Sequence, residues 1–358
     1  MTGSASPGTW AGTNRSTSAT IQPNMLRYLL VVAGERGVDL QPALAAVGLD
    51  PQLLRTTDIR VSYRQGSTVI QRALHLTGDA HLGLAVGGAQ HLTAWGLLGF
   101  ALLASETVQE AVEIGVRYQN QSGAMAVWST QHDPDGFALY ADLPDPGLDP
   151  GVDVFLVDEA LSSVVSLARR AVGSAFAPQR VEFTAPRPPG HARYAELFRC
   201  PVRFGAPRNR CVFTPAWARF PVPSHDPWTL ARTLALLDRE SAAQHAQQDL
   251  LEVLEVSIAR SLPDVPSITE QARRLSASER TLRRRLAQCD TTYEALADGV
   301  RRERVEQLLR HSPATLREVA RRAGFADERA LRRAVHRWHG MTPVQLRDAI
   351  NAPQPTAP

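Results

Sequence analysis

A helix-turn-helix pattern that occurs twice near the C-terminus constrains the fold more than any other feature of this sequence. In the first copy, residues 266–288, the apolar residues follow a helical period and Ser278 can cap a second helix. The second copy, residues 315–340, has Gly324 in the turn and Asp327 as the cap. Two short helices joined by such a turn form a unit that places its second helix in the major groove of DNA.

A long helix is predicted between the two copies. Residues 292–311 carry apolar side chains at helical spacing. A helix of this length spans about 30 Å, which is close to the ~34 Å of one turn of DNA. One chain can therefore place two helices in successive major grooves on the same side of a duplex.

The second helix of each copy has an outward face rich in arginine. Residues 263–350 hold 18 Arg against 12 Asp and Glu, whereas the rest of the chain has a small excess of acids, and the sequence contains no lysine. Arginine binds guanine or phosphate through two parallel hydrogen bonds, and a glutamate can accept one from cytosine. A single copy could be an ordinary helical bundle with a solvated arginine face. Two basic copies in tandem favour DNA binding instead. We expect these residues to contact DNA: Ser278, Arg280, Arg283, Arg284, Glu328, Arg329, Arg332 and Arg333.

The preceding 200 residues have mixed periodicity. Helices are predicted within 24–119 and over 152–172, and a hairpin over 124–143. Further strands are predicted at 180–185, 201–204 and 210–214. The fold class is thus an α+β N-terminal domain with a sheet of about five strands, followed by an all-α DNA-binding domain with two helix-turn-helix units.

The chain divides into five segments by composition. We expect a disordered tail at 1–20, an α+β domain at 21–226, an interrupted helical linker at 227–262, the DNA-binding domain at 263–350 and a tail at 351–358. The family resemblance given below implies that the domain at 21–226 binds an effector and dimerises. The linker either forms the dimer contact and transmits motion between the domains, or it consists of a final helix packed on the first domain and a first helix packed on the second. Met1 and Met25 are both candidate start residues.

Composition and motifs argue against several protein classes. The sequence has no run of ~18 apolar residues, no apolar leader and only three cysteines, so we expect a cytoplasmic protein without a membrane span. No nucleophile elbow, phosphate loop or metal-ligand spacing occurs, so we expect no catalytic residue, cofactor or metal. The alternative is an enzyme or a ligand-independent scaffold that the C-terminal domain localises to DNA.

A small-molecule effector is expected to bind the N-terminal domain. Aromatic side chains near the hairpin are candidates for a pocket wall, and nearby polar groups are candidates for orienting an anionic ligand. The alternative is that the aromatic side chains simply pack in the core and that the polar side chains simply lie on the surface. The candidate effector-binding residues are His91, Trp95, Arg117, Trp128 and Tyr140.

Residues 263–350 resemble the DNA-binding domain of the AraC/XylS family of bacterial transcription regulators. The resemblance rests on Val319-Ala320, Gly324-Phe325, Asp327, Arg333-Ala334, Arg337-Trp338, Gly340-Met341-Thr342-Pro343 and Leu346-Arg347, and in the first copy on Ser278, Arg280, Leu282 and Arg284-Arg285-Leu286. Residues 25–225 are similar to the arabinose-binding-like N-terminal domain of one branch. The resemblance implies a homodimeric regulator that binds double-stranded DNA and a small effector, contacts RNA polymerase, and activates rather than represses.

Overall fold

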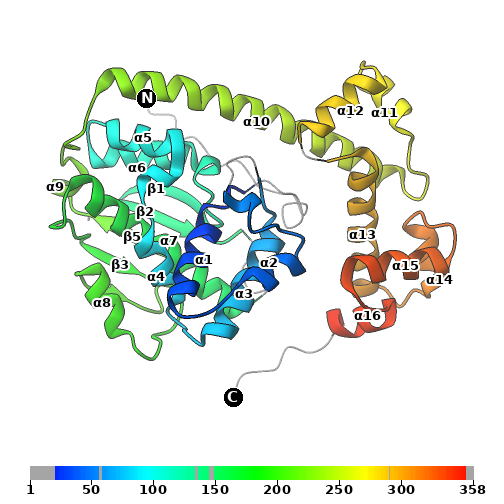
Figure 1. Cartoon of the computed structure of the whole chain (residues 1–358), viewed down its shortest axis with the longest axis horizontal. Helices are drawn as coiled ribbons and strands as arrows, with labels where there is room; N and C mark the ends of the chain where they lie inside the picture. The colour runs from blue at the N-terminus through cyan, green and yellow to red at the C-terminus, as the bar shows by residue number, and fades with distance from the viewer. Residues whose placement is uncertain (1–20, 56–58, 134–135, 145–148, 290, 352–358) are drawn as a thin grey trace. The chain divides into compact units, whose positions relative to one another are not determined.

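The computed structural model describes residues 21–55, 59–133, 136–144, 149–289 and 291–351 (Figure 1). The chain forms two compact units, one ending at Arg239 and the other beginning at Glu240. Among the described helices, none combines the length and the apolar character that a membrane crossing requires. Each unit is described below by itself.

The first unit begins with helices that share one apolar core. α3 starts with a capping box, in which Ser62 accepts a hydrogen bond from the Gln65 backbone N–H and the Gln65 side chain accepts one from the Ser62 N–H. The apolar faces of these helices bury Leu29 and Ile70 in one core with Phe155, which lies later in the chain. The helices are α1 (Asn24–Glu35), α2 (Gln41–Ala46), α3 (Tyr63–Thr77) and α4 (Leu82–Ala89), with the 3-10 helix η1 (Leu53–Arg55).

A five-stranded sheet forms the other part of this unit, as the sequence predicted. The strand order is β1-β2-β5-β3-β4, and every neighbouring pair is antiparallel except β3 with β4. Phe137, Leu139 and Phe213 project from the sheet into one core with Leu161 and Val165 of α7 (Pro150–Val172). The strands are β1 (Val127–Asp133), β2 (Gly136–Asp142), β3 (Arg180–Glu182), β4 (Val202–Arg203) and β5 (Arg210–Phe213).

The remaining helices of the first unit frame the sheet. Thr107 caps α6 by accepting a hydrogen bond from the Glu110 backbone N–H at 3.2 Å. Thr214 caps the short α9 in the same way. These elements are η2 (Leu92–Trp95), α5 (Gly96–Ala104), α6 (Val108–Arg117), η3 (Gln119–Gln121), α8 (Ala192–Phe198) and α9 (Pro215–Ala218).

Glycine allows α4 to lie directly against α7. A Cβ placed on Gly83 would collide with the backbone carbonyl of Phe155, and one placed on Gly87 would collide with Ser162 and the carbonyl of Glu159. These two glycines therefore permit the close contact between α4 and α7.

Two buried carboxyl groups lie side by side in sequence on α7 but have different partners. Asp158 accepts a hydrogen bond from the Tyr194 hydroxyl at 2.7 Å, and Glu159 accepts one from the Gln90 amide. Burial raises the pKa of each carboxyl to about 7, although these hydrogen bonds act in the opposite direction. Neither carboxyl is positioned to share a substrate with the other.

These carboxyls predict a pH dependence of stability. Because both pKa values lie above those of the unfolded chain, the folded state retains protons that the unfolded state releases. The free energy of unfolding should therefore fall as pH rises from about 4 to 7 and level off above that range. Urea denaturation should show a flatter profile in a chain carrying Asp158→Asn and Glu159→Gln. An unchanged profile would assign the pH dependence to other groups.

The second unit is entirely helical in its described part. α10 (Pro227–Ser261), whose residues up to Arg239 belong to the first unit, is one continuous helix, so the predicted interruption of the linker is wrong. No proline or glycine lies between Trp228 and Ser261, which removes the usual causes of a break. The helices that follow are α11 (Ile268–Arg274), α12 (Glu279–Ala287), α13 (Tyr293–His311), α14 (Leu316–Arg322), α15 (Glu328–His339) and α16 (Pro343–Asn351).

Two separate apolar cores lie along α13. Its N-terminal half contributes Leu296 and Val300 to a core that also holds Leu282 and Leu286 of α12. Its C-terminal half contributes Val305, Leu308 and Leu309 to a second core. That second core also holds Val319 of α14 and Leu331 and Val335 of α15. Each helix-turn-helix therefore has its own core.

Candidate nucleic-acid interface and effector cavity

The first helix-turn-helix consists of α11 and α12. Leu275 ends α11, and Ser276 takes a left-handed backbone conformation in the turn, with φ of 52°. Ser278 then caps α12, its hydroxyl accepting a hydrogen bond from the Thr281 backbone N–H at 3.1 Å. Leu282 and Leu286 are each 1% exposed, so the opposite face of α12 carries the polar side chains outward.

The arginines of α12 fall into two groups. Nε of Arg283 donates to Oε1 of Glu279 at 2.9 Å. The Thr269 hydroxyl and Arg283 together hold the pKa of Glu279 below its usual value, which keeps this carboxylate charged. Arg280 and Arg284 are exposed, and no ion pair engages them within the described residues. These two arginines are available to a ligand without breaking an internal bond.

The second helix-turn-helix, α14 and α15, has the same construction. Gly324 provides the turn with φ of 75°, where a Cβ would press on the Pro263 carbonyl. Asp327 caps α15 by accepting a hydrogen bond from the Ala330 backbone N–H at 2.7 Å. Leu331 and Val335 are fully buried. The predicted caps and turn residues of both copies are thus observed.

The arginines of α15 repeat the pattern of α12. Arg332 pairs with Glu328 across one helical turn, with 3.6 Å between Nη2 and Oε2. Arg329 and Arg333 are exposed and have no ion pair in the part of the chain that the structure describes. Glu328, a candidate reader of cytosine, is therefore already engaged by a neighbouring arginine.

α13 separates the two arginine-bearing helices. Its 19 residues correspond to about 28 Å of helix. Asp298 fixes α15 against it, because its carboxylate accepts hydrogen bonds from Arg337 at 2.8 Å and from the Trp338 indole N–H at 2.8 Å. Sequence reasoning missed this role of Asp298, which lies 40 residues from Trp338.

An apolar cavity of about 100 Å³ lies in the first unit. It opens between the core face of the sheet, α6 and the C-terminal half of α7. Among its described lining residues, Ser122 alone carries a hydroxyl and none is ionisable. The cavity exists because small residues occupy part of its wall, namely Ala111 and Gly115 on α6 and Ala168 and Ala171 on α7.

The five candidate effector residues do not share one site. Trp95 and Trp128 both line the apolar cavity. His91 is exposed, and Arg117 pairs with Asp238 at 2.9 Å. Tyr140 is buried on the other face of the sheet, where the Arg208 guanidinium lies 4.0 Å from its ring centre. The geometry thus brings together the two tryptophans and leaves the other three elsewhere.

The wall of the apolar cavity is also the packing surface for α10. Trp95 and Leu102 line the cavity and pack into a cluster with Leu230, Leu234 and Leu237 of α10. Tyr118, which follows α6, donates a hydrogen bond from its hydroxyl to Asp238 at 2.6 Å. Farther along the same helix, Leu254 and Ile258 are fully buried in the core of the first helix-turn-helix. α10 therefore contributes core residues to both units.

Comparison with known proteins agrees with this geometry. Residues 37–222 match the family described as "Arabinose-binding domain of AraC transcription regulator, N-term". Residues 271–349 match a helix-turn-helix domain family. The chain belongs to the AraC family of transcription regulators. It is a DNA-binding regulator with an arabinose-binding-like N-terminal domain, and its families and relatives are transcription regulators rather than enzymes.

Relatives of this AraC-family chain match along most of its length. The ornithine utilization regulator of Pseudomonas aeruginosa is 30% identical over 90% of this chain and 94% of that protein. An uncharacterized HTH-type transcriptional regulator of Mycobacterium tuberculosis is 28% identical over 89% and 94%. The crystal structure of the transcriptional regulator CdpR from Pseudomonas aeruginosa is 25% identical, with a TM-score of 0.43, and covers 86% of this chain and 96% of that one.

The AraC-family signature after α15 has a structural explanation. Gly340 ends α15 in a left-handed conformation, with φ of 68°. Thr342 and Gln345 then start α16, since Thr342 accepts from the Gln345 N–H and the Gln345 side chain accepts from the Thr342 N–H. Arg347 returns to the Ala314 carbonyl at 2.7 Å. The motif thus closes the second core with α16, a helix absent from the sequence-based prediction.

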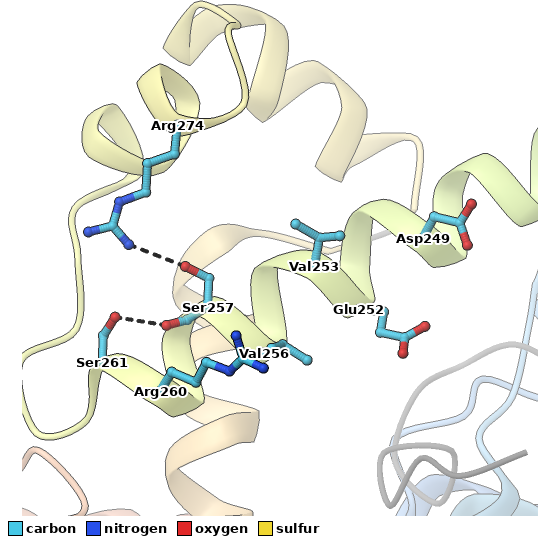
Figure 2. A pocket seen from close by; sticks show the side chains of 8 residues that line it. All are labelled: Asp249, Glu252, Val253, Val256, Ser257, Arg260, Ser261 and Arg274. Atoms are coloured by element: carbon cyan, nitrogen blue, oxygen red, sulfur yellow. Dashed lines mark hydrogen bonds between the residues drawn. The ribbon is translucent and has the colours of Figure 1, made fainter.

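A shallow groove runs along the C-terminal half of α10 beside α11 (Figure 2). Figure 2 shows Arg274 reaching toward Ser257, whose hydroxyl accepts its hydrogen bond at 3.4 Å. Ser257 also bonds the Gln271 side chain at 2.9 Å. Val253 and Val256 are exposed there. These polar contacts attach α10 to the first helix-turn-helix in addition to its apolar packing.

Proposed function

We propose that this regulator binds a small molecule in the apolar cavity and that occupancy changes how α12 and α15 engage DNA. The observation that carries the proposal is the double role of Trp95 and Leu102, which line the cavity and also pack against α10. A ligand that displaces these side chains acts on α10, which also contributes Leu254 and Ile258 to the core of the first helix-turn-helix. Such a ligand shifts the equilibrium only to the extent that it binds one arrangement more tightly.

The DNA contacts belong to the two arginine-bearing helices in this proposal. Arg280, Arg284, Arg329 and Arg333 read base edges or phosphates, because they are exposed and free of ion pairs among the described residues. Arg283 and Arg332 exchange or share their glutamate partners to reach phosphate. The full proposed set is Ser278, Arg280, Arg283, Arg284, Glu328, Arg329, Arg332 and Arg333.

Selection of fragmented genomic DNA by the purified full chain at about 150 mM salt tests this function. We expect a discrete motif with two elements about one helical turn apart. Recovery that is independent of sequence and disappears as salt rises would leave only the phosphate contribution and would contradict specific recognition.

The effector proposal predicts a preference for apolar ligands. Because no ionisable side chain lines the cavity in its described part, a ligand of benzene or indole size should stabilise the chain, whereas a free sugar or amino acid should not. Saturating ligand at about 100 times its Kd adds about 2.7 kcal/mol to the free energy of unfolding. Differential scanning fluorimetry with toluene, indole, arabinose and ornithine measures this.

A cavity-filling variant is the matched control for that experiment. Ala168→Leu adds three carbon atoms to a side chain that lines the cavity and should abolish the shift caused by the apolar ligands. A shift that survives Ala168→Leu, or a shift caused by the polar compounds, would locate the effector site elsewhere.

Activation, contact with RNA polymerase, homodimer formation and a cytoplasmic location complete the proposal and rest on the family resemblance. In vitro transcription from a selected promoter, with and without the chain, distinguishes activation from repression. Increased transcript supports an activator, and decreased transcript indicates a repressor.

A further inference from the structure

The helices α12 and α15 carry the same residue pattern at the same distance from their caps. Counting from Ser278 and from Asp327, both helices read Glu-Arg-x-Leu-Arg-Arg. The repeat concerns the outward residues as well as the core residue. A repeat in the core alone would reflect only the shared helix-turn-helix fold.

The repeat extends to the internal ion pairs. In each helix the first glutamate pairs with the arginine four residues later, Glu279 with Arg283 and Glu328 with Arg332. The shared pattern holds three arginines, and in each helix the pair neutralises one of them. It leaves two exposed arginines four residues apart, which lie on one edge of the helix, one turn from each other. These are Arg280 and Arg284 in α12, and Arg329 and Arg333 in α15.

The two helices also bury the same side. Leu282 and Leu286 of α12 correspond in position to Leu331 and Val335 of α15, and all four are at most 1% exposed. The outward edge is therefore the same edge in both helices. From the caps to the end of α12, the positions that differ are Ser278 against Asp327 as the cap, Thr281 against Ala330, the exposed Arg285 against the buried Ala334, Leu286 against Val335, and Ala287 against His336.

We propose that α12 and α15 read the same short element containing guanine, so that the DNA target of one chain holds this element twice, about one helical turn apart. Equivalent arginines at equivalent positions present the same donors, and guanine O6 and N7 are the base atoms that accept two hydrogen bonds from one arginine. The inference rests on the proposed function, since it requires that both helices enter the major groove.

Two single substitutions at equivalent positions test the inference on the full chain. Enrichment of random duplex DNA by the unmodified protein should yield two copies of one element. Arg280→Ala should then relax the requirement for a guanine in one copy, and Arg329→Ala should relax it at the corresponding place in the other. Each substitution should weaken binding of the enriched duplex by about 10- to 100-fold. Arg260→Ala on α10 removes the same charge from outside both helices and is the control.

The outcomes separate this inference from the function on which it rests. A motif of two unlike elements, or a loss of specificity in only one of the two variants, overturns the inference and leaves specific DNA recognition intact. Enrichment without sequence preference overturns both. Two copies in either relative orientation, with matched effects of the two variants, support the inference.

Discussion

Replacing Arg284 and Arg333 together by alanine is expected to lower the affinity of the full chain for its selected DNA by at least about 30-fold. Each arginine is exposed, and neither forms an ion pair with another described residue. Loss of a two-pronged contact to guanine costs about 1–3 kcal/mol, and the two sites lie in separate helix-turn-helix units, so the costs should add. Fluorescence anisotropy with a labelled duplex measures the change.

The matched control for this double variant is Arg260→Ala with Arg273→Ala. Both residues are exposed arginines of α10 and α11 that leave the arginine-bearing helices untouched. The control should weaken binding far less and should leave discrimination between specific and random duplexes unchanged. Equal losses in the two double variants would mean that general positive charge, rather than base recognition, dominates the affinity.

Substitution of Gly87 by alanine is expected to lower the free energy of unfolding of the first unit by about 3 kcal/mol. The new Cβ would collide with the Ser162 side chain and with the backbone carbonyl of Glu159, and backbone cannot rotate out of the way. α4 and α7 must therefore separate, which opens gaps in a core that is otherwise closely packed. Urea denaturation followed by circular dichroism measures the loss.

Gly88→Ala is the control at the adjacent position. Its Cβ would meet the Leu197 and Ser166 side chains at 3.9 Å, which is ordinary contact. Because alanine favours a helix over glycine by up to about 1 kcal/mol, this variant should be as stable as the unmodified chain or more so. A stable Gly87→Ala protein would show that α4 and α7 do not need their close approach.

Local signals were sufficient to predict the DNA-binding helices. Ser278, Asp327 and Gly324 act through hydrogen bonds and backbone conformations within a few residues, so the sequence pattern contains all the information needed. The pairing of Glu279 with Arg283 also lies within one helical turn and was available from spacing alone. The sheet was predicted from its short apolar runs, although its strand order was not.

The apolar cavity required the tertiary structure. Its lining joins Trp95, Val116, Trp128, Ala168 and Val222, and no local period relates residues so far apart in the chain. Large aromatic side chains are typical of ligand pockets, so the sequence pointed to the two tryptophans. Small residues carry no such signal, and the alanines and the glycine that create the space were not predicted. Polar residues such as Arg117 were chosen as ligand contacts because the pairing with Asp238, 121 residues away, cannot be read from sequence.

The two separate cores along α13 have a consequence for how the target of such a regulator can change over generations. A substitution that reshapes the core around Leu296 and Val300 leaves the core around Leu308 and Leu331 undisturbed. If each helix-turn-helix reads its own half of the target, as proposed, selection can alter one half of the recognised DNA while the other half keeps the protein at its promoter. A lineage can then move to a new operator through intermediates that still bind, one half at a time.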